Sequence, residues 1–149
     1  MSVISINLIW KLEGGDLTPG NYSNKHKIKF NNDISITGDS APDWNGDPMN
    51  SNPEQTLAAS LSSCHMMTFL ALAAKMSWPV LTYKDNAIAT LGKNSNGKMS
   101  VTSIELNPKV EFSKNFKIDQ EKLKEVQNRA HKYCFIANSL SSEVLIKIN

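Results

Sequence analysis

The chain has 149 residues, 40% of them hydrophobic, and a formal net charge of +2. This length suits one domain with its own core and is short for two, so we expect a single domain over residues 1–149. The lysines are scattered and Arg129 is the one arginine, which argues against nucleic acid as a partner.

The first third of the sequence predicts three short strands. Residues 3–11 alternate apolar and polar side chains, which is typical of a half-buried strand. The apolar residues that would share one face of it are Ile4, Ile6, Leu8 and Trp10. Glycines and prolines follow and end this strand. Residues 26–30 and 33–37 then predict a short hairpin around the turn Asn31-Asn32.

Residues 38–53 predict a long loop, because this stretch holds two glycines and three prolines. Loops of such length inside a compact domain often have a function. Trp44 and Met49 are its large apolar side chains. They either cover a pocket or only fix the loop to the core.

Residues 52–76, NPEQTLAASLSSCHMMTFLALAAKM, predict a long helix that the rest of the chain surrounds. Asn52 is a good N-cap and Pro53 is tolerated in a first turn. Glu54 suits the positive end of the helix dipole. Apolar side chains cover nearly the whole circumference, so we expect this helix inside the domain or against a partner subunit.

Residues 55–74 of this helix are uncharged and long enough to raise the question of a membrane span. Five hydroxyl side chains and His65 make the segment a poor membrane helix, so we expect a soluble, buried helix and no membrane partner. The first residues of the chain lack the basic and apolar regions of a signal peptide. With two cysteines, this predicts a reducing, cytoplasmic location, where a disulfide is transient and chemical.

Two stretches after the long helix predict further strands. Residues 81–91 have strand character, and a turn is expected at 94–97. Residues 100–113 alternate most cleanly, with apolar side chains at every second position over much of the stretch. They predict one strand with one wet face, in which Pro108 suggests a sheet edge or a bulge.

Residues 119–134, DQEKLKEVQNRAHKYC, predict a second helix capped by Asp119. Its single apolar stripe consists of Leu123, Val126, Ala130 and Tyr133. A closing strand is expected at 143–148. The order of elements predicts an α+β fold with a mainly antiparallel sheet, a long buried central helix and a second helix.

The two cysteines are the candidate reactive groups. Cys64 lies in SSCHMMT within the long helix, and Cys134 follows the second helix in HKYCFIANS. One buried cysteine alone is usually inert. Two of them, each with hydroxyl and histidine neighbours, favour a working pair. A thiol reacts as its thiolate, so such a site needs a cation or a helix N-terminus nearby to lower the thiol pKa.

The neighbouring histidines do not offer simple activation. His65 follows Cys64 directly and points about 100° away from it on a helix. His131 lies three residues before Cys134 and shares a face with it if the helix continues. A metal site made of both cysteines and both histidines is an alternative, but the CH…HxxC spacing matches no standard zinc pattern, so we expect no metal.

Glu54 is a candidate partner of the thiol, although it cannot reach Cys64 of its own chain. Ten residues of straight helix separate the two, which is about 15 Å along the axis. If Glu54 serves the thiol, it comes from a second subunit whose helix packs antiparallel to the first. The alternative is that Glu54 only complements the helix dipole.

Two stretches carry a resemblance to a known family. NPEQTLAASLSSCHMMTFLALAAK around Cys64 and AHKYCFIANS around Cys134 resemble the OsmC/Ohr family of thiol-dependent hydroperoxide reductases, in particular its OsmC-like branch. The order and spacing of the surrounding segments agree along nearly the whole chain. The resemblance implies an OsmC-like fold and an intertwined homodimer, with the two central helices packed inside a pair of sheets and two active sites at the interface.

The resemblance also implies roles for three residues. The cysteine that matches Cys64 is peroxidatic: its thiolate attacks the peroxide, releases an alcohol or water, and becomes a sulfenic acid. The cysteine that matches Cys134 resolves the sulfenic acid to a disulfide, which an external dithiol reduces. The glutamate that matches Glu54 orients the site from the partner chain.

The chain departs from the family pattern at one position. Family members typically carry an arginine in the early strand region that pairs with the glutamate and stabilises the thiolate, and that position falls here at Asn24 or Lys25. Lys25 is therefore a candidate thiolate activator that supplies charge without a bidentate fork. His26 is a further candidate.

Two functions from different classes follow. The first is a peroxidase that reduces organic hydroperoxides or hydrogen peroxide by a Cys64–Cys134 cycle, needs no cofactor, and has a peroxide substrate and an external dithiol as partners. The second is a weakly active or non-catalytic OsmC-like dimer that binds a small apolar ligand or senses the redox state. The two cysteines and Glu54 favour the first, and the missing arginine favours the second.

Overall fold

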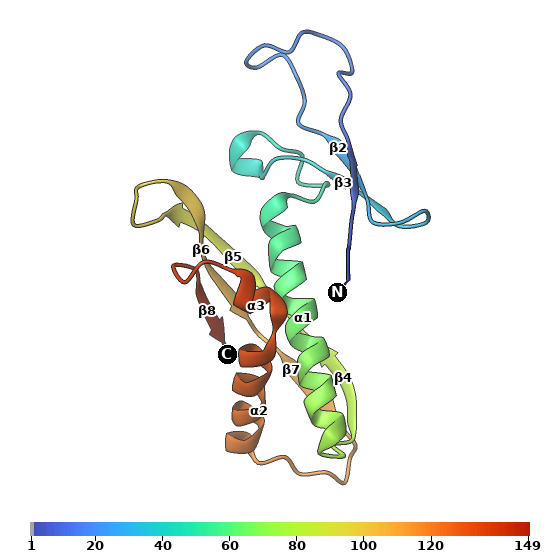
Figure 1. The fold of residues 1–149 in the computed structure, drawn as a ribbon, viewed down its shortest axis with the longest axis vertical. Coiled ribbons are helices and arrows are strands. Elements are labelled where there is room, and N and C mark those ends of the chain that lie inside the picture. Colours follow the sequence, from blue (N-terminus) through green and yellow to red (C-terminus); the bar gives the residue numbers. More distant parts are fainter. Residues whose placement is uncertain (1) are drawn as a thin grey trace. The chain divides into compact units, whose positions relative to one another are not determined.

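The computed structural model describes residues 2–149 (Figure 1). The chain forms two compact units, the first ending at Thr56 and the second running from Leu57 to Asn149. The helices are α1 (Pro53–Lys75), α2 (Gln120–Tyr133) and α3 (Phe135–Ser139), with a short 3-10 helix at Pro42–Trp44. The strands are β1 (Asn7–Ile9), β2 (His26–Lys29), β3 (Ser35–Gly38), β4 (Val80–Lys84), β5 (Ile88–Lys93), β6 (Met99–Leu106), β7 (Lys109–Phe112) and β8 (Leu145–Ile148).

The first unit is built on the antiparallel sheet β1-β2-β3. The predicted hairpin is confirmed as β2 and β3, which pair with His26 opposite Gly38. The strand predicted over 3–11 is shorter, because only Asn7–Ile9 find partners on β2. Its residues are all exposed, so its predicted half-burial is wrong within this chain. Of residues 2–56, only Gly38 and Asp39 are buried.

Helix α1 begins and ends with recognisable caps. Asn52 accepts a hydrogen bond from the backbone N–H of Gln55 (2.8 Å), and the Gln55 side chain accepts one from the N–H of Asn52 (3.2 Å). This reciprocal pair is a capping box, which confirms the predicted start. At the other end Ser77 takes a left-handed φ of 55°, and the N–H of Trp78 bonds the Ala73 carbonyl. That geometry closes the last turn.

The second unit contains two small sheets and the helices α2 and α3. Strands β4 and β7 pair antiparallel, and β5-β6-β8 form a second sheet. The stretch 100–113, predicted as one strand, is two strands, because Pro108 has no N–H to donate and the chain changes sheets there. Only β6 and β8 pair in parallel, so the sheets are mainly antiparallel as predicted.

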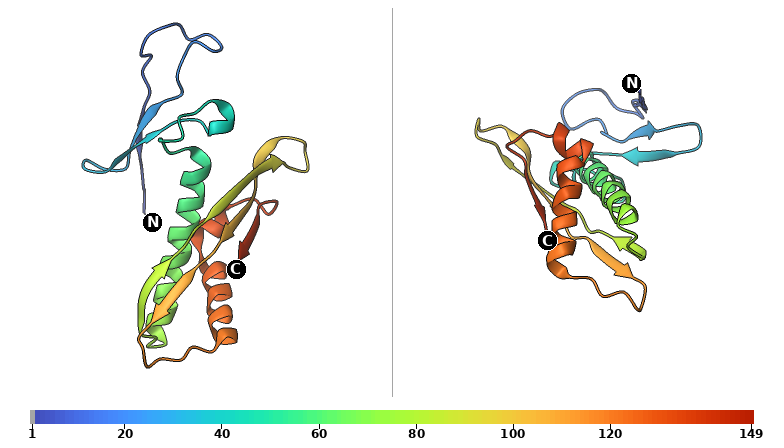
Figure 2. Two further views of the ribbon diagram at one scale, coloured as in Figure 1. Left: turned by 180° about the vertical axis from the view of Figure 1, so that it is seen from behind. Right: turned by 60° about the horizontal axis from the view of Figure 1, so that its bottom comes forward.

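Figures 1 and 2 show α1 and α2 side by side on one face of strands β4 to β7. Ala58 and Leu61 of α1 pack in one apolar cluster with Ile104 and Leu106 of β6. About two turns further along α1, a second cluster combines residues of α1 and α2: Phe69, Ala73, Val126 and Ala130. The predicted α+β class is confirmed, and α1 forms the shared spine of both clusters.

Among residues 2–149, α1 is the one helix long and apolar enough to cross a membrane by length and composition. A core helix of a soluble protein has the same properties. Its buried residues recur at three- and four-residue spacing, which is one face of a helix packed against protein: Ala58, Leu61, His65, Phe69 and Ala73. That α1 lies wholly inside a soluble assembly stays a prediction.

Candidate active site

Cys64 and Cys134 lie next to each other in the second unit, although seventy residues separate them in the sequence. Cys64 is half-buried on α1, whereas Cys134 is fully buried. Both thiols are free, and the thiol of Cys134 hydrogen-bonds to the sulfur of Cys64. The second unit therefore brings the two predicted reactive groups into one site.

Cys134 is held at a junction between two helices. Helix α2 ends at Tyr133, one residue before the predicted end, and Cys134 has an extended conformation with ψ of 116°. Its N–H bonds the His131 carbonyl (3.2 Å), and its Sγ accepts the N–H of Ala137 (3.5 Å). Because the helix does not continue, His131 and Cys134 share no helix face, which answers that part of the sequence hypothesis.

The surroundings of Cys64 favour its thiolate. Partial burial by itself raises the pKa of this thiol. The backbone N–H of Ile136, the thiol of Cys134 and the backbone N–H of Phe135 all direct hydrogen bonds at the sulfur and lower the pKa. The lowering outweighs the burial, so the pKa of Cys64 lies below its ordinary value.

The hydroxyl of Thr68 also lies beside Cys64 and lowers its pKa. However, a threonine hydroxyl has one proton, and Thr68 donates it to the carbonyl oxygen of Cys64 at 2.9 Å. We therefore assign the stabilisation of the thiolate mainly to the three donors contributed by residues 134–136.

The pKa of Cys134 moves in the opposite direction. Burial raises it first, and the hydrogen bond and charge of Cys64 raise it further, to about 11. At neutral pH Cys134 is thus a protonated donor and Cys64 the acceptor. Two titratable groups whose surroundings separate their pKa values are a common feature of reactive sites.

Glu54 and Lys25, two further predicted site residues, lie in the first unit. Glu54 lies in the first turn of α1, and its Oε2 is buried without a hydrogen-bond partner among residues 2–149. The side chain of Lys25 is exposed and forms no ion pair in the described part of the chain. Their roles stay predictions.

His26 and Asn24 lie beside Lys25 and are occupied locally. Nδ1 of His26 donates to the carbonyl oxygen of Asn24 at 2.7 Å. The imidazole packs on Gly38, where an added Cβ would come within 2.5 Å of the ring. His26 therefore has a structural place in the β2–β3 hairpin.

The histidine beside Cys64 belongs to the core. His65 is fully buried, and its Nε2 bonds Oε1 of Gln127 at 2.7 Å. Because Oε1 can only accept, the ring proton is on Nε2. Burial lowers the pKa of His65, and the nearby His131 adds to the lowering. Within residues 2–149, no three His, Cys, Asp or Glu side chains come together as a metal site.

Sequence reasoning missed Gln127 and the backbone donors of residues 135 and 136. Gln127 had a detectable signal: it stands four residues after Leu123 and three before Ala130, inside the predicted apolar stripe. A polar side chain in such a stripe indicates a buried hydrogen bond. The backbone donors had no signal, because they depend on a tertiary approach of two segments.

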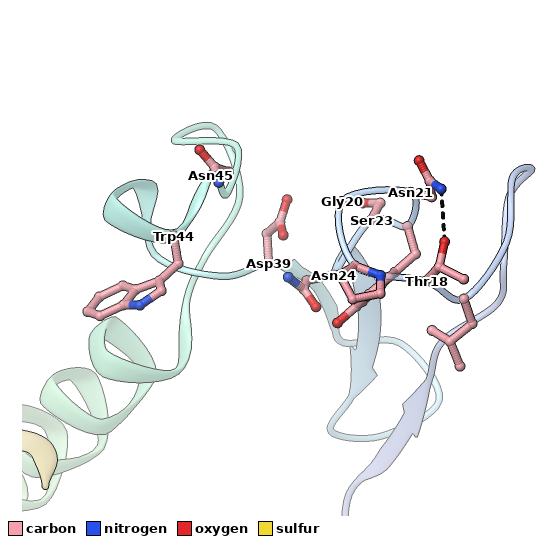
Figure 3. A pocket seen from close by; sticks show the side chains of 11 residues that line it. Thr18, Gly20, Asn21, Ser23, Asn24, Asp39, Trp44 and Asn45 are labelled. Carbon is pink, nitrogen blue, oxygen red and sulfur yellow. Dashed lines mark hydrogen bonds between the residues drawn. The ribbon is translucent and has the colours of Figure 1, made fainter.

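The first unit holds an open cleft of about 1270 Å³ (Figure 3). Most of its labelled lining is polar: Thr18, Asn21, Ser23, Asn24, Asp39 and Asn45, with Trp44 as the large aromatic side chain. Trp44 thus lines a cavity, as one sequence hypothesis held, whereas Met49 is exposed and does not. Neither cysteine lines the cleft.

The fold and the paired thiols define an α+β protein with a two-cysteine site. Residues 45–149 match the model of the OsmC family, described as OsmC-like protein, and the chain belongs to this family. No curated protein gives a significant match.

Solved structures agree along the whole chain. An OsmC-like protein of unknown function from Vibrio cholerae is 39% identical, with a TM-score of 0.90 and 100% of each chain covered. The organic hydroperoxide resistance protein OsmC of Legionella pneumophila is 14% identical, with a TM-score of 0.71, covering 99% of this chain and 97% of its own. The organic hydroperoxide resistance protein OhrB of Bacillus subtilis is 18% identical, with a TM-score of 0.67, covering 99% and 98%.

Proposed function

We propose that this protein is a thiol-dependent peroxidase that reduces organic hydroperoxides or hydrogen peroxide. The observation that carries the proposal is the packing of two free thiols in one site, where the surroundings lower the pKa of Cys64 and raise that of Cys134 to about 11. The lowered pKa makes Cys64 the nucleophile, and the raised pKa keeps Cys134 protonated until it reacts with the sulfenic acid. Similar folds in the Legionella and Bacillus hydroperoxide resistance proteins support the substrate class.

The cycle uses both thiols and no cofactor. The Cys64 thiolate attacks the terminal oxygen of the hydroperoxide, the O–O bond breaks, and the alkoxide leaves as an alcohol after protonation. Cys64 becomes a sulfenic acid. The sulfur of Cys134 then attacks the sulfur of Cys64, its proton leaves with the hydroxyl as water, and a disulfide forms. An external dithiol reduces the disulfide by exchange.

A second copy of the chain completes the site in this proposal. Thirteen of the twenty exposed large apolar side chains of the described residues lie in 2–56. Only 33% of the most apolar window of α1 is buried within the chain. Surface of this kind favours an intertwined homodimer. Glu54 with its unpartnered Oε2, and Lys25 as candidate activator, would then act on Cys64 of the partner.

A second function has one observation in its favour. Among residues 2–149, the groups that lower the pKa of Cys64 include no charged side chain, and the Vibrio protein at 39% identity is described as a protein of unknown function. In that alternative the dimer binds a small apolar ligand or senses the redox state, and turns over peroxide slowly or not at all. We also propose a cytoplasmic location, with neither nucleic acid nor membrane as a partner.

Titration of the free thiols after one equivalent of cumene hydroperoxide, compared with hydrogen peroxide, separates the two functions. A peroxidase loses both thiols rapidly, and a dithiol restores them. Cys64→Ser abolishes turnover, whereas Cys134→Ser consumes one peroxide and retains a sulfenic acid that dimedone labels. Thiols that stay titratable for many minutes, or equal residual activity in both variants, would contradict the proposal.

A further inference from the structure

His65 is a polar residue at the centre of an apolar face. The buried residues of α1 are Ala58, Leu61, His65, Phe69 and Ala73. The first two belong to the cluster that contains Cys134, and the last two to the cluster shared with α2. An apolar side chain at position 65 would join these clusters, yet an imidazole with an unpartnered Nδ1 is buried there. Burying a polar group costs free energy unless hydrogen bonds compensate it, and here the single bond of Nε2 to Gln127 has to do so.

That hydrogen bond joins the two helices that carry the cysteines. His65 directly follows Cys64 on α1, and Gln127 lies seven residues before Cys134, about two turns along α2. Both side chains are buried, and the Nε2 to Oε1 distance is 2.7 Å. The bond is therefore protected from competition by water and fixes one point of α2 against one point of α1.

The apolar contacts between these helices do not fix position as sharply. Around this point they are made by apolar side chains of both helices: Phe69, Leu70, Leu72 and Ala73 on α1, and Leu123, Val126 and Ala130 on α2. Hydrophobic attraction is non-directional, whereas a hydrogen bond requires a defined distance and angle between its atoms. Setting the register between helices is the best-attested role of buried polar groups.

We propose that His65 and Gln127 are positioning residues that hold Cys134 where it can form a disulfide with Cys64. A disulfide tolerates a narrow geometry, with Cβ atoms about 3.5–4.5 Å apart and a dihedral near 90°. A rotation of α2 by a fraction of a turn displaces Cys134, since this residue directly follows the helix. This inference rests on the proposed function for its biological use, but the cysteine geometry is testable without peroxide.

The first test is equilibrium with glutathione. Two thiols and one glutathione disulfide give the Cys64–Cys134 disulfide and two reduced glutathiones, and alkylation followed by mass spectrometry counts the products. His65→Leu leaves the Gln127 amide unpaired, and we expect the equilibrium constant to fall about tenfold, which corresponds to about 30 mV. Gln127→Glu retains an acceptor oxygen and should remain close to wild type.

Val126→Ala is the matched control. It removes apolar packing next to Gln127 but leaves the His65–Gln127 bond in place. We expect it to lower the melting temperature without changing the glutathione equilibrium. A change in Val126→Ala as large as in His65→Leu would overturn the inference, because general loosening of the helices would then explain both. An unchanged equilibrium in folded His65→Leu would overturn it as well.

The second test follows oxidation by cumene hydroperoxide. In His65→Leu we expect sulfenic acid to form more slowly, because a displaced Cys134 donates less well to the Cys64 sulfur. Once the sulfenic acid has formed, we expect the disulfide to close about tenfold more slowly and more Cys64 to reach the sulfinic acid. Failure of wild type to react with peroxide, together with a shifted glutathione equilibrium in His65→Leu, would reject the peroxidase and keep the positioning role. A wild-type pair that forms no disulfide with glutathione would reject the positioning role.

Discussion

The two units of the chain differ in what holds them together. Residues 57–149 contain two apolar clusters around α1 and both cysteines. Residues 2–56 contain a three-stranded sheet in which only Gly38 and Asp39 are buried. The first unit is therefore ordered by backbone pairing and loop hydrogen bonds, and the second also by side-chain packing.

Because of this difference, we expect the second unit to fold and to set its thiol chemistry within one chain. We expect the first unit to depend on a second copy of the chain. A three-stranded sheet whose apolar side chains stay exposed to water gains little stability from hydrophobic burial. The second unit, by contrast, already sets the pKa values of its thiols with its own groups. If the comparison is right, perturbing the second unit affects folding and thiol chemistry, whereas perturbing the first unit affects assembly.

Phe69→Ala should produce the largest effect. Phe69 is fully buried and its ring packs against those of Trp78 and Tyr83. Removing a buried phenylalanine side chain costs about 3–5 kcal/mol of unfolding free energy. Chemical denaturation followed by tryptophan fluorescence measures the loss.

Phe30→Ala makes the same chemical change in the first unit. Phe30 is 43% exposed, so we expect a loss several times smaller than for Phe69→Ala when both variants are monomeric. Equal losses of unfolding free energy in the two variants would mean that the first unit has a core of its own. The proposed difference between the two units would then be wrong.

Leu8→Asp should change the oligomeric state. Leu8 pairs with Ile28, which pairs with Ile36, so the three side chains form an apolar row across the sheet. Loss of one buried leucine contact costs about 1.5–3 kcal/mol, and a charge adds to it. We therefore expect the dimer dissociation constant to rise by about 100-fold or more, measured by sedimentation velocity.

Asn7→Asp is the control for Leu8→Asp. It introduces the same side chain one position earlier, on the opposite face of β1. The proposed homodimer should survive this change. If both variants dissociate equally, charge repulsion and not the apolar row explains the effect. An unchanged dimer in Leu8→Asp would show that the apolar row is not part of the interface.

The elements that the sequence predicted best are those set by neighbouring residues. The Asn52 cap, the Asp119 cap and the β2–β3 hairpin all depend on side chains within a few positions. The split at Pro108 was predicted only as an edge or bulge. Which strand each half joins depends on distant partners, β7 with β4 and β6 with β5 and β8, and no local pattern encodes that choice.

The candidate site likewise has features that neighbouring residues predict and features that only tertiary contacts determine. The importance of the two cysteines was inferred from their neighbours and from a family resemblance, but their hydrogen bond is a tertiary contact between α1 and the start of α3. The sequence left a cation or a helix N-terminus open as the activator of Cys64. Among residues 2–149 the donors are the thiol of Cys134 and the backbone N–H groups of Phe135 and Ile136, which are the first residues of α3. That this particular helix start approaches Cys64 depends on tertiary packing, which no local motif marks.

Cys134→Ala tests whether the second unit activates Cys64 by itself. The thiol of Cys134 is one of the groups that lower the Cys64 pKa, and its removal should raise that pKa. A hydrogen bond to a charged group is worth about 1.5–3 kcal/mol, so alkylation of Cys64 by iodoacetamide at pH 7 should slow by about tenfold or more.

Cys134→Ser retains a donor and should keep most of the alkylation rate. Lys25→Gln removes the candidate activator from the first unit. If the alkylation rate fell more in Lys25→Gln than in Cys134→Ala, the first unit of a partner subunit would activate Cys64. That result would contradict activation by the second unit alone. Peptide mass spectrometry that resolves Cys64 from Cys134 supplies the rates.

The smallest expected effect is the contribution of single titratable groups to folding stability, which appears only at acidic pH. The two units should lose stability at different pH values. Burial, with the nearby His131, lowers the pKa of His65. The folded second unit therefore binds fewer protons than the unfolded chain below about pH 6.5, and its stability falls as the pH drops through the folded pKa. Above pH 6.5 this contribution is constant. His65→Leu combined with Gln127→Leu should flatten the dependence, and Val126→Ala should not.

Asp39 gives the first unit a pH range of its own in which its stability changes. Burial raises the pKa of this carboxyl, but the N–H groups of Asp47 and Ser40 lower it more, so the folded pKa lies below the ordinary value. The stability that Asp39 contributes is present above about pH 3.9 and is lost as the pH falls through the folded pKa. Hydrogen exchange should thus detect loss of protection in the second unit at a higher pH than in the loop at Asp39. Loss at one common pH would show that the two units unfold as one.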